Sequence, residues 1–306
     1  MPDAAANPSP ASSRGRAFVR RLGSSVVLWT VVLWAIFSSN PWIANGVFLG
    51  IMLLLAGFGL AEFYGLMERR GLVCFKEWGV FGGLLLMAST FVYLSGILGY
   101  KEAPAKANDF ESSLVVLFVL GLCVRQLCYP ANQNGLLAIA TTLFGLMYVP
   151  WLLNFVQKIN YFPRIGGQGP YYVLFFIVVT KLSDTGAYVV GSLCGRHKMI
   201  PRVSPGKTWE GFAGALLFSS GASLLAAHLA GSHLPGLTTV HALVLGLLLG
   251  GAAVVGDLIE SLFKREAGVK DSGGFFPGIG GILDLLDSLL FNAPLMYLYL
   301  RHVLTN

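Results

Sequence analysis

The residues best suited to chemistry lie in the last third of the sequence, where acidic and basic side chains recur at helical intervals. They are Asp257, Glu260, Ser261, Lys264, Asp284 and Asp287. The first four are spaced so that an α-helix would place them on one face, and the same holds for the last two. Neighbouring carboxylates repel one another unless a cation lies between them, and Mg²⁺ is a hard cation that prefers such oxygen ligands. The pattern therefore predicts a site for metal-bound phosphates.

Basic and hydroxyl side chains that suit phosphate contacts lie in two segments close to these acids. They are Ser204 and Lys207 in the segment 192–211, and Ser261, Lys264, Arg265 and Lys270 in the segment 259–280. If both segments lie on one side of the protein, they can face a single site.

Two simpler explanations compete with a functional site. Lys181 and Asp184 have the spacing of a structural ion pair on a helix. Asp284 and Asp287 could merely complement the dipole at the start of a helix. Neither explanation accounts for so many acids at the two ends of one connecting segment, so we favour the functional interpretation.

The composition decides what kind of molecule positions these residues. Of the 306 residues, 55% are hydrophobic and only 12% are charged, whereas soluble domains contain about 25% charged residues. This balance excludes a soluble enzyme, a nucleic-acid-binding domain and a disordered chain. It predicts an all-α polytopic membrane protein.

Nine segments are long and apolar enough to cross a bilayer, which requires about 20 residues per helix. They are residues 23–39, 42–62, 79–99, 112–129, 135–156, 170–191, 211–230, 238–258 and 281–300. We divide the chain into a disordered basic tail (1–22), N-terminal transmembrane helices (23–165) and a C-terminal catalytic transmembrane region (166–306). The segments 192–211 and 259–280 are then loops of the catalytic region.

The positions of Lys and Arg orient these spans. With the N-terminus in the cytoplasm, 15 of the 21 basic residues fall on the cytoplasmic side, five fall on the opposite side and Lys181 lies within a span. Cytoplasmic loops of membrane proteins carry such an excess of positive charge. We therefore expect a multi-pass protein of the plasma (inner) membrane, with its N-terminus and its site-bearing loops in the cytoplasm.

At these residues the sequence resembles the phosphatidate cytidylyltransferase family, whose members are also called CDP-diacylglycerol synthases. The family signature reads Ser-x-x-Lys-Arg, four residues, Lys-Asp, a Gly/Pro-rich turn, His-Gly-Gly and Asp-Arg-x-Asp. With every spacing kept, the matching residues are Ser261, Lys264, Arg265, Lys270, Asp271, Gly280, Gly281, Asp284 and Asp287. The segments 184–188, 203–211 and 256–261 also look like the family's, so the resemblance extends over most of the C-terminal region.

The resemblance implies an enzyme that transfers CMP from CTP to phosphatidate, giving CDP-diacylglycerol and pyrophosphate, in phospholipid biosynthesis. It implies Mg²⁺, alone or with a monovalent cation, held by Asp257 and Asp284. The expected catalytic residues are Asp257, Lys264, Asp284 and Asp287, and the expected substrate contacts are Ser204, Lys207, Ser261, Arg265 and Lys270. The expected partners are CTP, phosphatidate and membrane lipids, with no nucleic acid, and the resemblance also suggests a homodimer.

Two signature positions differ, because Ile279 stands in place of His and Leu285 in place of Arg. Every acidic signature position is kept, which favours a divergent active enzyme, since a decaying site would first lose its costly buried carboxylates. Two alternatives stay open. The protein could use CTP on another lipid, such as a polyprenyl alcohol or an ether lipid. It could also be a transporter in which Lys181, Asp184 and Asp257 line an ion pathway.

Overall fold

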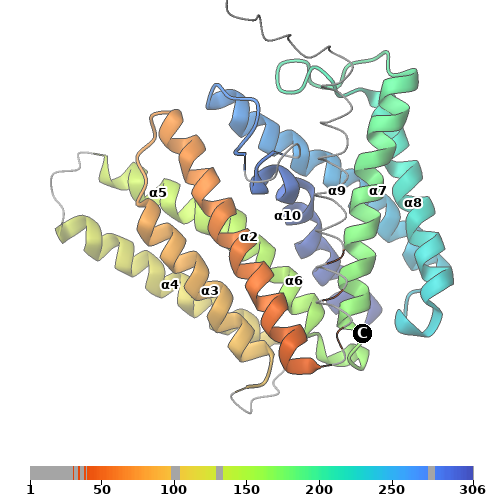
Figure 1. The fold of residues 1–306 in the computed structure, drawn as a ribbon, viewed down its shortest axis with the longest axis horizontal. Helices are drawn as coiled ribbons and strands as arrows, with labels where there is room; N and C mark the ends of the chain where they lie inside the picture. Colours follow the sequence, from red (N-terminus) through yellow and green to blue (C-terminus); the bar gives the residue numbers. More distant parts are fainter. Residues whose placement is uncertain are drawn as a thin grey trace, which may run out of the picture.

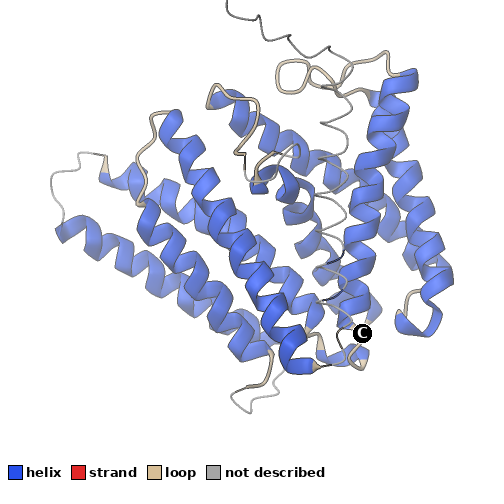
Figure 2. Ribbon diagram, viewed as in Figure 1, coloured by secondary structure: helices blue, strands red, loops and turns tan. Residues whose placement is uncertain are grey.

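The protein is described here by a computed structural model that covers residues 40–97, 104–128, 134–274 and 280–305, together with Thr30, Trp34 and Ser38. These residues form helices joined by short connections, and no β-strand occurs among them (Figure 1, Figure 2). The predicted tail 1–22 and nearly all of the predicted span 23–39 lie outside the described residues.

Each predicted span from 42–62 onward corresponds to a helix or a run of helices, and several of these helices extend beyond the predicted bounds. They are α2 (Pro41–Arg69), α3 (Lys76–Leu94), α4 (Pro104–Cys128), α5 (Gly135–Leu146), η1 (Met147–Trp151), α6 (Leu152–Asn160), η2 (Pro163–Ile165), α7 (Gly169–Cys194), α8 (Trp209–Ala230), η3 (Gly231–His233), α9 (Thr239–Glu266), α10 (Ile282–Tyr299) and η4 (Leu300–Leu304). In the described part of the chain, eight helical segments are long and apolar enough to cross a membrane. This confirms the prediction of an all-α polytopic membrane protein.

Two predicted loops are shorter in the structure. α9 continues to Glu266, so the first part of the predicted loop 259–280 is helical. The loop predicted over 192–211 spans only residues 195–208, between α7 and α8. The apolar run of α9 stops earlier than the helix does, because the last turns carry polar residues that face other helices. Hydropathy alone therefore places the end of this helix too early.

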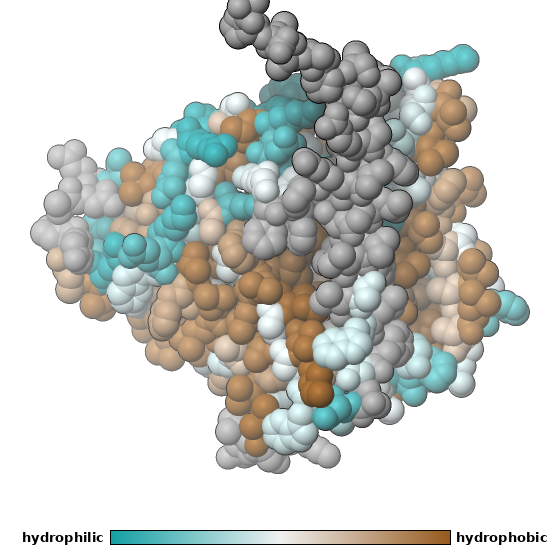
Figure 3. Space-filling model, in the orientation of Figure 1, coloured by the Kyte–Doolittle hydropathy of each residue, from teal (hydrophilic) through white to brown (hydrophobic). Residues whose placement is uncertain are grey.

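The helices alternate in direction, so the connections between them gather at two ends (Figure 1). The α2–α3, α7–α8 and α9–α10 connections share one end, which we call the site end. The α6–α7 and α8–α9 connections lie at the other. A space-filling view shows hydrophobic side chains across the middle of the visible face and hydrophilic ones along both edges, as expected for a membrane-spanning bundle (Figure 3).

The helices of the C-terminal region pack closely because small residues lie between them. A Cβ atom at Gly186 of α7 would lie 2.6 Å from the carbonyl oxygen of Gly214 of α8, and a Cβ atom at Gly214 would lie 2.6 Å from that of Gly186. Reciprocal contacts of this kind bring membrane helices into backbone contact. The side chains at the site end are thereby held on a rigid group of helices.

A cluster of aromatic rings joins the N-terminal helices to the C-terminal ones. Phe263 of α9 lies 6.0 Å, centroid to centroid, from Phe63 of α2 and 5.4 Å from Tyr148 of η1. The turn η1 is a π-helix that contains Pro150, and its wider geometry accommodates a residue that cannot donate a backbone hydrogen bond. One hydrophobic core therefore extends across both predicted regions of the chain.

Candidate active site

The C-terminal turns of α9 present the polar face that the spacing predicts. Ser261 Oγ donates a hydrogen bond to Asp257 Oδ1 over 3.3 Å, and Lys264 forms an ion pair with Glu260. Both contacts join residues four positions apart, as expected for one side of a continuous helix. Glu260 is fully buried, so its carboxylate faces the interior of the bundle.

Asp284 fixes the start of α10. Its Oδ2 atom accepts hydrogen bonds from the backbone N–H groups of Gly281 over 2.8 Å and Ser272 over 3.2 Å, and it lies 3.0 Å from Ser272 Oγ. A carboxylate three positions into a helix satisfies the N–H group at the helix start in this way. Complementing the helix start, the simpler explanation considered for this residue, is therefore part of its role.

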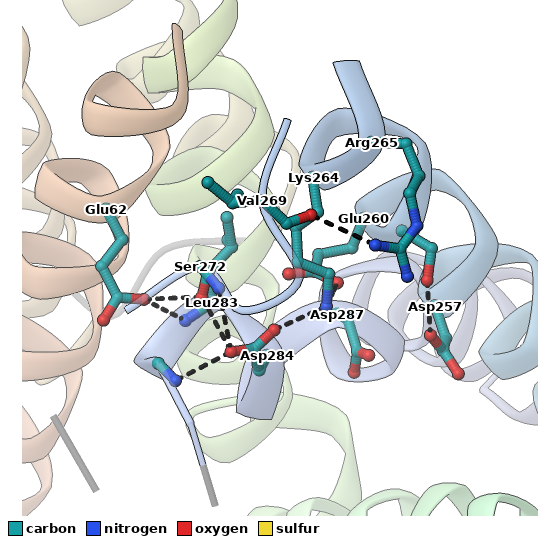
Figure 4. A network of polar contacts seen from close by, with 12 residues as sticks. Glu62, Asp257, Glu260, Lys264, Arg265, Val269, Ser272, Leu283, Asp284 and Asp287 are labelled. Carbon is teal, nitrogen blue, oxygen red and sulfur yellow. Dashed lines mark hydrogen bonds and ion pairs between the residues drawn. The ribbon is translucent and has the colours of Figure 1, made fainter. Parts of the chain in front are cut away.

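Lys264 connects α9 to α10. Its Nζ atom lies 2.6 Å from Asp284 Oδ1 and also contacts Glu260 (Figure 4). The side chains of Lys264 and Asp284 are each only 12% exposed, so little water competes for these contacts. The structure thus brings two of the predicted catalytic residues into direct contact.

Three carboxylates converge where α9 and α10 meet. Asp257, Glu260 and Asp287 each offer an oxygen atom, and these atoms lie within 4.8 Å of one another; we call these residues the carboxylate trio. The close approach of the two helices depends on Gly256, because a Cβ atom there would lie 2.5 Å from the carbonyl oxygen of Asp287. A larger residue would push α10 away and separate the carboxylates.

The carboxylate trio fits the needs of a hard divalent cation. Its donors are all oxygen atoms, which Mg²⁺ prefers. Oε1 of the buried Glu260 has no hydrogen-bond partner among the described residues, and none of their Lys or Arg side chains forms an ion pair with Asp287. This grouping differs from the predicted ligand pair, because Asp257 belongs to the trio whereas Asp284 faces Lys264 and the segment before α10.

Lys207 reaches the site from the connection between α7 and α8. Its Nζ atom lies 2.7 Å from Asp257 Oδ2 and donates to the carbonyl oxygen of Val254 over 3.3 Å. Beside it lies a cavity of about 380 Å³ between α7, α8 and α9. The lining includes the polar residues Asp184, Ser204, Lys207, Thr208 and Asp257 and the apolar residues Ala187, Met199, Phe212 and Val254. Charged groups beside apolar walls suit a ligand that has both an anionic and an apolar part.

The connection that carries Ser204 and Lys207 is held in place by the start of α8. Thr208 accepts a hydrogen bond from the backbone N–H of Gly211 over 3.1 Å and so caps the helix. Glu210 Oε2 accepts a hydrogen bond from the backbone N–H of Arg196 over 3.0 Å. These bonds tie both ends of the connection to one helix, so Lys207 is presented from a fixed backbone.

Lys181 and Asp184 form the ion pair that their spacing predicts, with 3.3 Å between Nζ and Oδ2. The pair also reaches α10. Lys181 Nζ donates to the carbonyl oxygen of Leu285 over 3.1 Å, and Ser288 Oγ lies 3.1 Å from Asp184 Oδ2. The pair therefore has a structural part, and its acid also lines the cavity next to Asp257.

Two of the predicted substrate contacts, Arg265 and Lys270, lie outside the group formed by the carboxylate trio, Lys207 and Lys264. Arg265 donates to the carbonyl oxygens of Val203 over 3.2 Å and Val269 over 3.3 Å, so it ties together the connections on either side of it. Lys270 is exposed on the connection after α9. Ile279, the residue in place of the signature His, lies outside the described residues.

The sequence analysis missed Glu62 of α2. Its Oε2 atom accepts a hydrogen bond from the backbone N–H of Leu283 over 2.9 Å and lies 3.1 Å from Ser272 Oγ (Figure 4). An acidic residue within a membrane span is itself a signal of function. That signal was lost because the predicted span ended at this residue, whereas α2 continues to Arg69.

Comparison with known proteins places these features in a family. The cytidylyltransferase family profile matches residues 20–303. A phosphatidate cytidylyltransferase of Staphylococcus haemolyticus (strain JCSC1435) is 33% identical over 259 residues, which cover 84% of this chain and 95% of that protein. A phosphatidate cytidylyltransferase of Mycobacterium leprae (strain TN) is 37% identical over 204 residues, which cover 63% of this chain and 62% of that protein.

A protein called YnbB, described as uncharacterized, from Escherichia coli (strain K12) is 42% identical over 161 residues. This match covers 53% of the chain and 51% of YnbB, so the chain spans about half the length of that relative. The family profile, in contrast, extends over nearly the whole chain and includes every helix from α2 to α10. The chain therefore belongs to the cytidylyltransferase family.

Proposed function

We propose that this protein transfers CMP from CTP to phosphatidate, giving CDP-diacylglycerol and pyrophosphate. The observation that carries the proposal is the convergence of the carboxylate trio, Lys207 and Lys264 at the site end of the bundle, beside a cavity with charged and apolar walls. The names of the relatives, two of which are phosphatidate cytidylyltransferases, support it. CTP is water-soluble and phosphatidate lies in the leaflet, so a site at the end of a membrane bundle serves both.

The reaction requires two polyanions to meet. A phosphate oxygen of phosphatidate attacks the α-phosphorus of CTP, a new P–O bond forms there, and the bond to the β-phosphate breaks as pyrophosphate leaves. Lys207 and Lys264 supply positive charge that offsets the repulsion between the phosphates, and the fixed backbone around Lys207 keeps this charge in place. No covalent bond between the protein and the substrate is needed.

We further propose that Asp257, Glu260 and Asp287 hold Mg²⁺. The convergence of their oxygens within 4.8 Å supports this assignment. The metal, when bound, neutralises phosphate charge and orients the α-phosphorus. The sequence predicts Asp284 as the second Mg²⁺ ligand, and this assignment stays a prediction. The proposal of a metal site includes a monovalent cation beside Mg²⁺.

The orientation of the protein and its assembly are also proposals. The basic loops between α7 and α8 and after α9 share the site end (Figure 1). Because such loops are retained in the cytoplasm, we propose that the site end faces the cytoplasm from the inner membrane, as CTP supply requires. A homodimer stays an expectation from the family resemblance.

The deciding experiment is turnover of labelled CTP by purified membranes that contain the protein, with phosphatidate, with and without Mg²⁺. We expect CDP-diacylglycerol only when CTP, phosphatidate and Mg²⁺ are all present. Product from a polyprenyl alcohol or an ether lipid, but not from phosphatidate, would replace the proposed substrate. Absence of any CTP-dependent product would overturn the assignment as an active enzyme and would favour the alternative hypothesis of a transporter.

The two departures from the family signature can be tested in the same assay. Ile279→His and Leu285→Arg restore the usual residues one at a time and together. If the divergent site is active as it stands, the unchanged protein already has measurable turnover, and the restored residues alter its rate. A protein that gains activity only after both changes is a decayed enzyme, which contradicts our proposal.

A further inference from the structure

Glu62 is a polar residue of the N-terminal helices that contacts the residues around the proposed site. It lies on α2 and is half-buried, and its carboxylate points to the segment that leads into α10 (Figure 4). Leu283 N–H donates to Glu62 Oε2 over 2.9 Å. This N–H belongs to the first turn of α10, where backbone donors have no partner within the helix and favour a negative charge.

Ser272 connects Glu62 to Asp284. Its Oγ atom lies 3.1 Å from Glu62 Oε2 and 3.0 Å from Asp284 Oδ2, and its backbone N–H also donates to Asp284 Oδ2. Two carboxylates from distant parts of the chain thus share one serine. Asp284 in turn contacts Lys264, so the chain of contacts from Glu62 ends at the proposed site.

Two glycines show how closely the chain passes the Glu62 carboxylate. A Cβ atom at Gly273 would collide with Oε1 of Glu62, and one at Gly281 would collide with both Oε2 of Glu62 and Oγ of Ser272. Gly273 and Gly281 therefore both lie directly against this carboxylate. A side chain at either glycine would displace the Glu62 carboxylate, so the contact depends on glycine at both positions.

We propose that Glu62 is a positioning residue of the active site. Through Ser272 and Leu283 it holds residues 272–273 and the start of α10 against α2, and these residues fix the carboxylate of Asp284 beside Lys264. Glu62 contacts neither member of that pair directly and acts through Ser272 and the start of α10. The inference rests on the proposed function, and it gives the N-terminal helices an indirect part in the reaction, as a support for the residues of the active site.

The test compares Glu62→Ala and Glu62→Gln with Glu68→Ala. Glu68 lies on the same helix, and its side chain forms a long, exposed pair with Lys76, so it is the matched control. We expect kcat to fall by roughly 10- to 100-fold in Glu62→Ala, as is typical when residues that orient a site are removed. Glu62→Gln, which keeps the size of the side chain and one acceptor oxygen, should lose less, and KM for CTP should change little in either.

Amide hydrogen exchange provides a readout that does not depend on activity. We expect faster exchange over residues 268–274 and 280–283 in Glu62→Ala and no change there in Glu68→Ala. Gly273→Ala alone should lower kcat, because its methyl group would collide with the Glu62 carboxylate. Added to Glu62→Ala, the same change should lower kcat no further, because that carboxylate is absent.

The inference and the proposed function can fail separately. Wild-type kcat and wild-type exchange in both Glu62 variants would overturn the positioning role while leaving the reaction intact. If the unchanged protein turns over no CTP, the proposed function fails, and the exchange experiment still decides whether Glu62 holds the segment. A fall in thermal stability with unchanged kcat and unchanged local exchange would also count against the proposal, since it indicates a general structural role.

Discussion

Lys264 Nζ lies 2.6 Å from Asp284 Oδ1 while its ammonium group also pairs with Glu260, so one lysine neutralises carboxylates from two helices. In the absence of Mg²⁺, removing it would leave the fully buried Glu260 without its positively charged partner. We expect Lys264→Met to destabilise the protein by about 3–5 kcal/mol, the usual cost of leaving a buried charge unpaired. Thermal unfolding in detergent measures the loss, and turnover should disappear with it.

The control for this variant is Lys76→Met. Lys76 pairs with Glu68 at 3.5 Å, but the two side chains are 41% and 49% exposed. Exposed pairs contribute at most about 1 kcal/mol, so this change should leave stability and turnover nearly unaltered. Equal losses in the two variants would contradict the role given to Lys264.

The carboxylate trio predicts which acids set the metal requirement. We expect Asp257→Asn, Glu260→Gln and Asp287→Asn each to raise the Mg²⁺ concentration needed for half-maximal turnover. Each should also lower the maximal rate by at least about 100-fold, because substitutions of residues that merely support metal ligands already cost about 10- to 100-fold in activity. Asp109→Asn, a change at an exposed acid of α4, serves as the control and should behave like the unchanged protein.

A matched measurement on Asp284→Asn separates the two ligand assignments. If the carboxylate trio holds the metal, Asp284→Asn lowers the rate because Lys264 and the start of α10 lose their partner. Its half-saturating Mg²⁺ concentration should then stay close to that of the unchanged protein. A strong shift in Mg²⁺ dependence at Asp284, with none at Asp287, would restore the ligand pair predicted from the sequence.

The position of Lys207 beside the cavity predicts that this residue contributes to the affinity for CTP. Its ammonium lies at the cavity, 2.7 Å from Asp257, and hydrogen bonds that involve a charged group contribute about 1.5–3 kcal/mol. We expect Lys207→Gln to raise KM for CTP by roughly 10- to 100-fold, since each 1.4 kcal/mol is a factor of ten. Lys198→Gln removes the same charge from an exposed position of the same connection and should change KM much less. A similar rise in both would indicate general electrostatic attraction.

A second buried ion pair lies away from the site. Glu111 of α4 and Lys158 of α6 are 2.5 Å apart, with side chains only 2% and 3% exposed. We expect Glu111→Gln to lower the unfolding temperature clearly, because the remaining charge is buried without its partner. Turnover per folded molecule should stay normal.

The double variant Glu111→Leu/Lys158→Met is the informative comparison for this pair. It removes both charges together and should be more stable than either single change. Loss of turnover in the double variant at full stability would show that this pair takes part in the reaction, against our expectation.

Much of the fold follows from the sequence, because the length of an apolar run sets where a membrane helix forms. The predicted spans 135–156 and 170–191 match the observed segments Gly135–Asn160 and Gly169–Cys194 within a few residues. Local spacing likewise predicts the contacts between residues on one helix face, such as Ser261 with Asp257 and Lys181 with Asp184. These features depend only on neighbours along the chain.

The grouping of the site residues was decided by tertiary structure. Spacing places Asp284 and Asp287 on one face of α10, but the close packing of α9 and α10 at Gly256 brings Asp287 to the other carboxylates, while Asp284 turns to Lys264. Glu62 is 221 positions from its partner Leu283, and no local pattern connects them. Their contact exists because α2 packs against α10, and helix packing depends on the fit of whole surfaces.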